Sequence, residues 1–245
     1  MTSALVLFAI LAVAGGVVAV AAPNPRHAVL GAFGAILVAA FATDPLPGGV
    51  ALIARTAGAA LGGWLAWIAV RPAPTETRRS ALGWAGSAGV AIVALLGGWL
   101  AAVSLGVTLA TPATDGSVSG IAASTLAAGS PVAAAAIGAA TALVILAATP
   151  VFRPRDGLRL GLGCVLLLAA GGMVVDALGS TPDDTTELAF AVLVACAGAA
   201  VAAVVATLLR TNGDLELHDG RRADAAVRHR SADEAHRRQG GTVAR

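Results

Sequence analysis

The chain contains no lysine and no tyrosine, and all 16 of its Lys-plus-Arg residues are arginine. Without a lysine amine the protein cannot hold retinal or pyridoxal phosphate as a Schiff base, and it cannot supply the lysine of a Walker-type phosphate loop. Of the four histidines only His27 lies outside the C-terminal tail, which excludes two axial histidines for a membrane haem. We find no nucleophile–base pair, metal-ligand set or nucleic-acid motif, so we expect no catalytic, metal or cofactor site.

Cysteine and charged residues are scarce as well. The two cysteines, Cys164 and Cys196, lie in separate apolar segments, where we expect small buried hydrophobic residues rather than a disulfide. Charged residues make up 12% of the chain and hydrophobic residues 57%, whereas a soluble domain carries about 25% charged residues. The mean hydropathy is +0.83. This composition has too few polar side chains to cover a globule and indicates an integral membrane protein.

The chain does contain a series of apolar stretches. A helix needs about 20 apolar residues to cross a hydrocarbon core of about 30 Å. We predict an all-α, polytopic membrane helix bundle with about seven transmembrane helices over residues 1–209, followed by a charged cytoplasmic tail, 210–245. The predicted spans are 4–22, 28–43, 50–70, 81–103, 131–149, 160–179 and 188–209. Residues 19–21 resemble a signal-peptide cleavage site, but no positive residue precedes the first stretch and six more follow, so we expect a span there.

Arginine is distributed unevenly over the loops between these spans. Fifteen of the 16 arginines fall on one side of a seven-span arrangement, in the loops after the first, third and fifth spans and in the tail. The opposite loops carry no arginine but several carboxylates: Asp44, Asp115, Asp183, Asp184 and Glu187. Because arginine-rich loops stay in the cytoplasm, we predict that the N-terminus is outside and the C-terminus inside. An even number of spans would destroy this alternation.

Two regions lack a span pattern. Residues 104–130 form a predicted outer connection rich in Ser, Thr, Gly and Pro, in which residues 121–128 are either a short helix at the membrane or a plain loop. The tail is mixed in charge and is either helical over 222–238 or disordered. Its histidines are too scattered among arginines to indicate a metal site.

Several residues are expected to anchor or pack helices. Trp67 and Trp84 lie near predicted cytoplasmic ends of spans and Trp99 lies near an outer end, as in the interfacial aromatic belt of membrane proteins. His27, beside Arg26, is expected to be an interfacial cap. Small residues let membrane helices approach closely. We therefore predict helix packing at five glycines: Gly58, Gly62, Gly83, Gly86 and Gly89.

Arg55 and Asp176 are the two ionisable residues that fall inside predicted spans. Arg55 lies about five residues, or about 7 Å, inside the third span, and Asp176 lies near the outer end of the sixth. Ionisable residues at membrane depth are costly and are candidates for function. Because both are predicted at similar depth on the same side, they either form an ion pair, which removes the cost of an isolated charge, or each extends to the outer interface.

The turn after the first span resembles a known membrane subunit. The sequence Asn24-Pro25-Arg26-His27-Ala28-Val29-Leu30 is similar to the Asn-Pro-x-His-Ala-x-Leu turn of subunit J of bacterial NADH–quinone oxidoreductase. That family has a Gly-Ala step behind a tyrosine in its third span. Here Gly58-Ala59 occupies a comparable place, but Thr56 stands where the family has the tyrosine.

The last three spans resemble subunit K of the same complex and the related component E of hydrogenase-4. The family pattern is a basic turn, a helix with a buried glutamate and an Ala-rich helix with a second glutamate. Residues 153–159 fit the basic turn, Gly163 fits a family glycine, and residues 190–201 follow the Ala-rich helix. Val165 and Gly198, however, stand where the family has its two glutamates. Since the resemblance implies that these carboxylates move protons, their loss puts proton translocation by this chain in doubt.

The leading hypothesis from the sequence is a non-catalytic membrane subunit of a respiratory-type complex, related to NADH–quinone oxidoreductase, group 4 hydrogenases or cation/proton antiporters. We expect the lipid bilayer and other membrane subunits as its partners, no nucleic acid, and a location in a bacterial inner membrane. Two alternatives stay open. One is a stand-alone permease, which would need polar residues near the bilayer midplane. The other is a membrane anchor whose tail recruits a partner.

Overall fold

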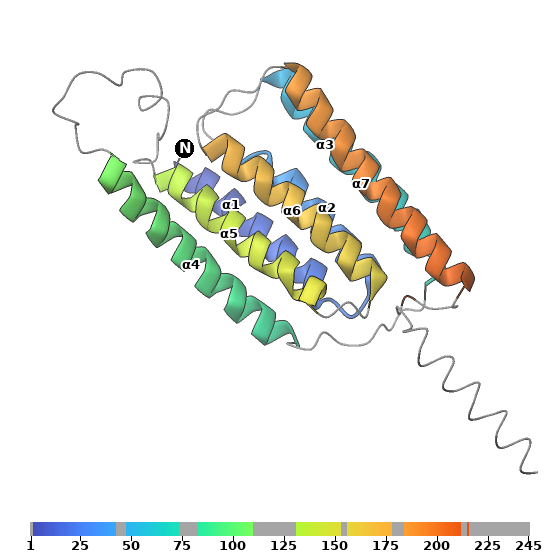
Figure 1. The fold of residues 1–245 in the computed structure, drawn as a ribbon. Helices are drawn as coiled ribbons and strands as arrows, with labels where there is room; N and C mark the ends of the chain where they lie inside the picture. The colour runs from blue at the N-terminus through green and yellow to red at the C-terminus, as the bar shows by residue number, and fades with distance from the viewer. Residues whose placement is uncertain are drawn as a thin grey trace, which may run out of the picture.

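The structure is a computed structural model that describes residues 2–42, 48–73, 83–109, 131–152, 156–177, 184–211 and 215. These residues contain seven α-helices and no β-strand, and the helices lie side by side in a bundle (Figure 1). The helices are α1 (Thr2–Ala21), α2 (Pro25–Ala39), α3 (Gly49–Val70), α4 (Gly83–Leu109), α5 (Pro131–Phe152), α6 (Gly157–Ala177) and α7 (Asp184–Thr211). The predicted all-α fold is confirmed.

Six of these helices are long and apolar enough to cross a membrane, and α2 is shorter. Its 15 residues span about 22 Å. Even so, α2 runs from one end of the bundle to the other. Arg26 in its first turn donates a hydrogen bond to the carbonyl of Arg71, directly after α3, while Ala39 in its last turn lines the same small cavity as Arg55, near the start of α3. The protein is therefore a multi-pass membrane helix bundle.

The helices are arranged around α5, which packs against α1, α4 and α6 and is the most buried of the long helices. In Figure 1 α4 forms one edge of the bundle, and α3 and α7 form a closely packed pair at the opposite edge. Between these edges lie α1, α2, α5 and α6. The largest fully buried side chains come mainly from the two central helices α5 and α6: Leu143, Leu146, Leu158, Leu162, Val165, Leu166 and Met173.

Glycine allows three pairs of helices to approach with their backbones nearly in contact. A Cβ atom added to Gly15 on α1 would lie 2.8 Å from the carbonyl oxygen of Gly31 on α2. On α4, a Cβ at Gly98 would lie 3.0 Å from the Cα of Gly138 on α5. In the α3–α7 pair, a Cβ at Gly198 would overlap the backbone of Gly62. Because lipid supplies no hydrophobic force between helices, such close packing is a principal source of their association.

The outward faces of the edge helices are apolar, as a lipid environment requires. On α4, Val93 is 73% exposed, and Ile92, Leu96 and Leu100 are exposed beside it. Both cysteines also face outward, so the expectation that they are buried is wrong. Each lies about one helical turn from an exposed apolar residue, Leu167 on α6 and Val192 on α7, and therefore belongs to a lipid-facing stripe rather than to the core.

Local capping sets several helix boundaries. The side chain of Asn24 accepts a hydrogen bond from the Arg26 backbone N–H at 3.0 Å, and Pro25 occupies the first turn, a favourable start for α2. The side chain of Asp156 similarly accepts from the Leu158 N–H at 3.0 Å and starts α6. The cap of α2 is thus Asn24, and His27, expected to be an interfacial cap, is an exposed residue of the first turn.

Candidate functional site: a buried arginine with two carboxylates

Arg55 on α3 forms two bidentate ion pairs at one end of the bundle. Its Nη1 and Nη2 atoms donate to Asp176 on α6 at 2.6 and 2.9 Å. Its Nε and Nη2 atoms donate to Glu187 on α7, both at 2.6 Å. A guanidinium group has five N–H donors in a planar fork that matches carboxylate geometry. Four of these donors are engaged here, so the geometry is that of a specific three-helix clamp.

This triad is almost completely buried. The side chains of Arg55 and Asp176 are each 8% exposed, and that of Glu187 is 4% exposed. The Phe190 ring lies 5.8 Å from the Arg55 guanidinium carbon, within range of a cation–π contact. Removing one partner of a buried ion pair leaves an uncompensated charge and is strongly destabilising. The triad therefore couples α3, α6 and α7 to one another at this end of the bundle.

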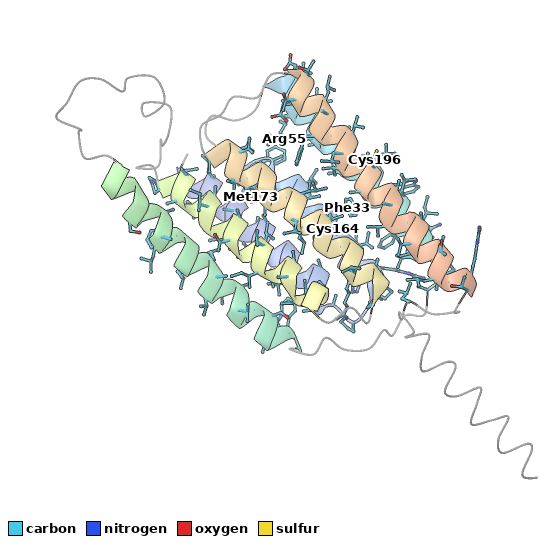
Figure 2. All side chains as sticks on the ribbon, in the orientation of Figure 1. Phe33, Arg55, Cys164, Met173 and Cys196 are labelled. Atoms are coloured by element: carbon cyan, nitrogen blue, oxygen red, sulfur yellow. The ribbon has the colours of Figure 1, made fainter. Side chains whose placement is uncertain are left out.

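Two of the triad residues, Glu187 and Arg55, lie on the buried face set by the helical repeat of their own helices. On α7, Glu187 is in phase with the buried residues Ala191, Val194 and Gly198, at successive intervals of three or four. On α3, Arg55 shares the buried face with Gly58 and Gly62, and a Cβ at Gly58 would lie 2.5 Å from the Ala191 carbonyl oxygen. The glycines thus bring α3 and α7 close enough for Arg55 to reach Glu187. Figure 2 shows Arg55 near one end of this helix pair.

A small cavity adjoins the triad. Its volume is about 10 Å³, which is about the space that one water molecule needs. Arg55 and Asp176 are its polar lining, and the remaining walls are apolar side chains and small residues of α2, α6 and α7: Ile36, Ala39, Ala40, Ala169, Gly172, Met173 and Phe190. A cavity this size holds no organic substrate, since ligand pockets span about 300–1,000 Å³.

The structure brings together the two charged residues singled out in the sequence, Arg55 and Asp176, and adds a third that sequence reasoning missed. The sequence pattern predicts Glu187 in an outer loop together with Asp183 and Asp184. In the structure α7 begins at Asp184, one turn earlier than the predicted span, so Glu187 lies within its first turn. The signal that was available is its helical spacing from Ala191 and Val194, which places the carboxylate on the buried stripe.

The predicted packing glycines divide into two groups. Gly58 and Gly62 lie in the α3–α7 contact, and the Phe33 ring from α2 packs over Gly62 and Gly63. A Cβ at Gly83 or Gly89 would meet no atom within 4 Å, so the expectation that they pack against a neighbouring helix is wrong within the described chain. Gly83 instead begins α4 with φ of +67°, a conformation that favours glycine. Gly86 is half-buried, and the close contact of α4 is made by Gly98.

The predicted interfacial tryptophans take different positions along their helices. Trp67 is half-buried in the last turn of α3, and Trp84 is exposed in the first turn of α4. Trp99 is 39% exposed but lies further from a helix end than predicted, because α4 continues to Leu109 instead of ending near residue 103. The predicted outer connection from residue 110 to 130 lies outside the described residues, and so does the tail apart from Arg210, Thr211 and Leu215.

No family model matches this chain, and neither a curated protein nor a solved structure is similar to it.

Proposed function

We propose that this chain is a non-catalytic membrane subunit of a respiratory-type complex, related to NADH–quinone oxidoreductase, group 4 hydrogenases or cation/proton antiporters. The resemblance to subunits J and K motivates the assignment. The structure of the J-like turn is compatible with the assignment, because the turn connects the start of α2 to the end of α3. Asn24 caps α2, and Arg26 donates to the Arg71 carbonyl at 2.8 Å, which attaches the turn to the end of α3.

The observation that carries the non-catalytic part of the proposal is the packing at Val165 and Gly198, where subunit K-like proteins have carboxylates. Val165 is fully buried on α6. A Cβ at Gly198 would already overlap the backbone of Gly62. Neither position has room for a glutamate without moving a helix, so these positions serve helix contact. We infer that the chain packs beside larger subunits rather than moving protons along the K-like route.

The hydroxyl side chains support the same interpretation. Thr56, Ser87 and Thr141 each donate to a backbone carbonyl four residues earlier in their own helix, at 2.8–3.0 Å. Thr207 donates in the same way at 2.8 Å, and Thr149 donates to the carbonyl three residues earlier at 2.7 Å. A permease needs polar groups directed toward a substrate near the bilayer midplane. These hydroxyls are directed toward their own backbones, which favours a packing subunit over a permease.

Gentle detergent extraction of the tagged protein, followed by native-gel sizing and mass spectrometry, tests the proposal. We expect a complex much larger than one chain, containing antiporter-like or quinone-reductase membrane subunits. Migration as a single chain or homo-oligomer would overturn it, and transport assays on Arg55 and Asp176 variants would then test the permease alternative. A variant that lacks residues 212–245 is the control for the anchor alternative. Only that alternative requires the tail for partner binding, so we expect the truncated chain to keep its partners.

A further inference from the structure

The end of the bundle opposite the triad is basic. Here α1, α3, α5 and α7 finish and α2, α4 and α6 begin. The described residues supply four arginines at this end: Arg26, Arg71, Arg159 and Arg210. Asp156 is the one carboxylate of the described residues at this end, and it is engaged. It caps α6, and its Oδ2 atom lies 3.4 Å from Nε of Arg159. We call this surface the basic end.

Two of these arginines are held at one corner of the basic end, between α2 and α3. The Nη2 atom of Arg26 donates to the backbone carbonyl of Arg71 at 2.8 Å, which attaches the Arg26 side chain to the end of α3. The Arg71 side chain is exposed, and no carboxylate of the described residues forms an ion pair with Arg26 or Arg71. The corner therefore carries two positive charges that attract an anion.

The start of α2 adds to the positive potential of this corner. A helix N-terminus carries about half a positive charge and offers backbone N–H groups to anions. Its capping side chain, Asn24, is neutral and satisfies one of these groups, the N–H of Arg26. The exposed His27 follows in the same turn. The start of α2, Arg26 and Arg71 therefore lie at the same corner.

An apolar surface continues directly from this corner along both helices. Leu30, one turn after Arg26 on α2, is 56% exposed, and Ile68, one turn before Arg71 on α3, is 45% exposed. Residues three or four apart lie on the same face of a helix. A cationic site above an exposed apolar face matches a molecule with an anionic head and a hydrocarbon chain.

We propose that the corner formed by Arg26, Arg71 and the start of α2 binds the phosphate of an anionic phospholipid, whose acyl chain lies over Leu30 and Ile68. Arginine matches phosphate with two parallel N–H bonds, and basic pockets between membrane helices recognise lipid headgroups in this way. The proposal is independent of the respiratory-complex assignment, since any multi-pass protein with this corner would bind such a lipid.

Native mass spectrometry of the purified protein tests the proposal. The full chain is exchanged into detergent with an equimolar mixture of dioleoyl phosphatidylglycerol and dioleoyl phosphatidylcholine, and the first lipid adduct is quantified. We expect phosphatidylglycerol to be preferred by the wild type, and the preference to fall roughly fivefold for each arginine removed. Arg71→Gln is the primary variant because it keeps the backbone carbonyl that Arg26 binds.

Three comparisons complete the design. Arg245→Gln removes the same charge at the last residue of the chain and should leave the preference unchanged. Arg71→Glu places a carboxylate beside Arg26 and should abolish the preference. Excess inorganic phosphate should not displace the lipid adduct, because the acyl chain contributes to binding. Equal binding of the two lipids by the wild type, an unchanged preference in Arg71→Gln, or displacement by inorganic phosphate would each overturn the proposal.

Discussion

The Arg55 guanidinium donates two hydrogen bonds to Glu187, a residue 132 positions further along the chain. The same group binds Asp176 through two further hydrogen bonds. Both carboxylates depend on a single cation, whereas the cation keeps one partner when either carboxylate is neutralised. The triad is therefore asymmetric, and substitutions within it should have unequal effects.

Arg55→Gln should be the most destabilising single substitution in the triad. It leaves two buried carboxylates facing each other without a cation, and breaking a buried ion pair costs about 3–5 kcal/mol. The measurement is the unfolding free energy or thermal midpoint of the purified protein in mild detergent. Arg210→Gln, which removes an exposed arginine from the last turn of α7, is the charge-matched control and should change stability by less than about 0.5 kcal/mol.

Neutralising either carboxylate should be milder. Asp176→Asn and Glu187→Gln each keep the side-chain shape and leave Arg55 paired with one carboxylate. We expect each to cost about 1–3 kcal/mol, the range for a weakened hydrogen bond to a charged group. The same thermal assay measures this. A loss from either amide equal to that of Arg55→Gln would show that the two carboxylates do not share the cation as described.

A triple substitution separates charge from fold. Arg55→Met combined with Asp176→Asn and Glu187→Gln removes every buried charge from the clamp. Removing one partner of a buried ion pair leaves an uncompensated charge, whereas neutralising all partners leaves no buried charge to desolvate. We therefore predict that the triple variant is more stable than Arg55→Gln alone. A triple variant less stable than Arg55→Gln would mean that the clamp acts through its shape and not through its charge.

Gly198→Ala should separate α3 from α7. The added Cβ would overlap the backbone of Gly62, so the helices must move apart, and overpacking of this kind costs about 1–3 kcal/mol. Thermal stability in detergent measures the effect. Gly89→Ala is the control, because its Cβ would enter open space, and the better helix propensity of alanine should leave stability equal or up to about 1 kcal/mol higher.

Much of the fold follows from the sequence because the bilayer restricts a spanning chain to a few architectures. Hydropathy alone locates the helices, since every described helix overlaps a predicted span. The details that hydropathy misses depend on local chemistry. The polar Asp184 and Glu187 lowered the apolar average at the start of α7, so that helix was predicted to begin late. The buried position of Glu187 can be inferred only from its helical spacing to Ala191 and Val194.

Contacts between helices were less predictable. Gly62 and Gly89 look alike in the sequence, since each lies in a pattern of regularly spaced glycines. The structure distinguishes them, because Gly62 meets Gly198 whereas Gly89 faces open space. Which side of a helix faces a neighbour depends on how all the other helices pack. Regular spacing of small residues therefore does not identify the helix that they contact. The outward positions of Cys164 and Cys196 escaped prediction for the same reason.

The predicted orientation is testable with single cysteines. In a Cys164→Ala, Cys196→Ala background, Ser3→Cys lies at the exposed start of α1 and Arg210→Cys at the exposed end of α7. Because arginine-rich ends stay in the cytoplasm, a membrane-impermeant maleimide should label Ser3→Cys in intact cells and Arg210→Cys only after permeabilisation. The reverse pattern, or labelling of both from outside, would contradict the seven-span orientation.

Photo-crosslinking in living cells tests whether this chain packs within a larger membrane complex. A photoreactive amino acid is placed at Val93 on α4, which is 73% exposed, or at Val192 on α7, which is 61% exposed, with the fully buried Leu143 as control. We predict a discrete protein adduct of higher mass from at least one exposed position, identified by mass spectrometry as another membrane subunit, and none from Leu143. Crosslinks only to lipid, or only to further copies of this chain, at both exposed positions would contradict it.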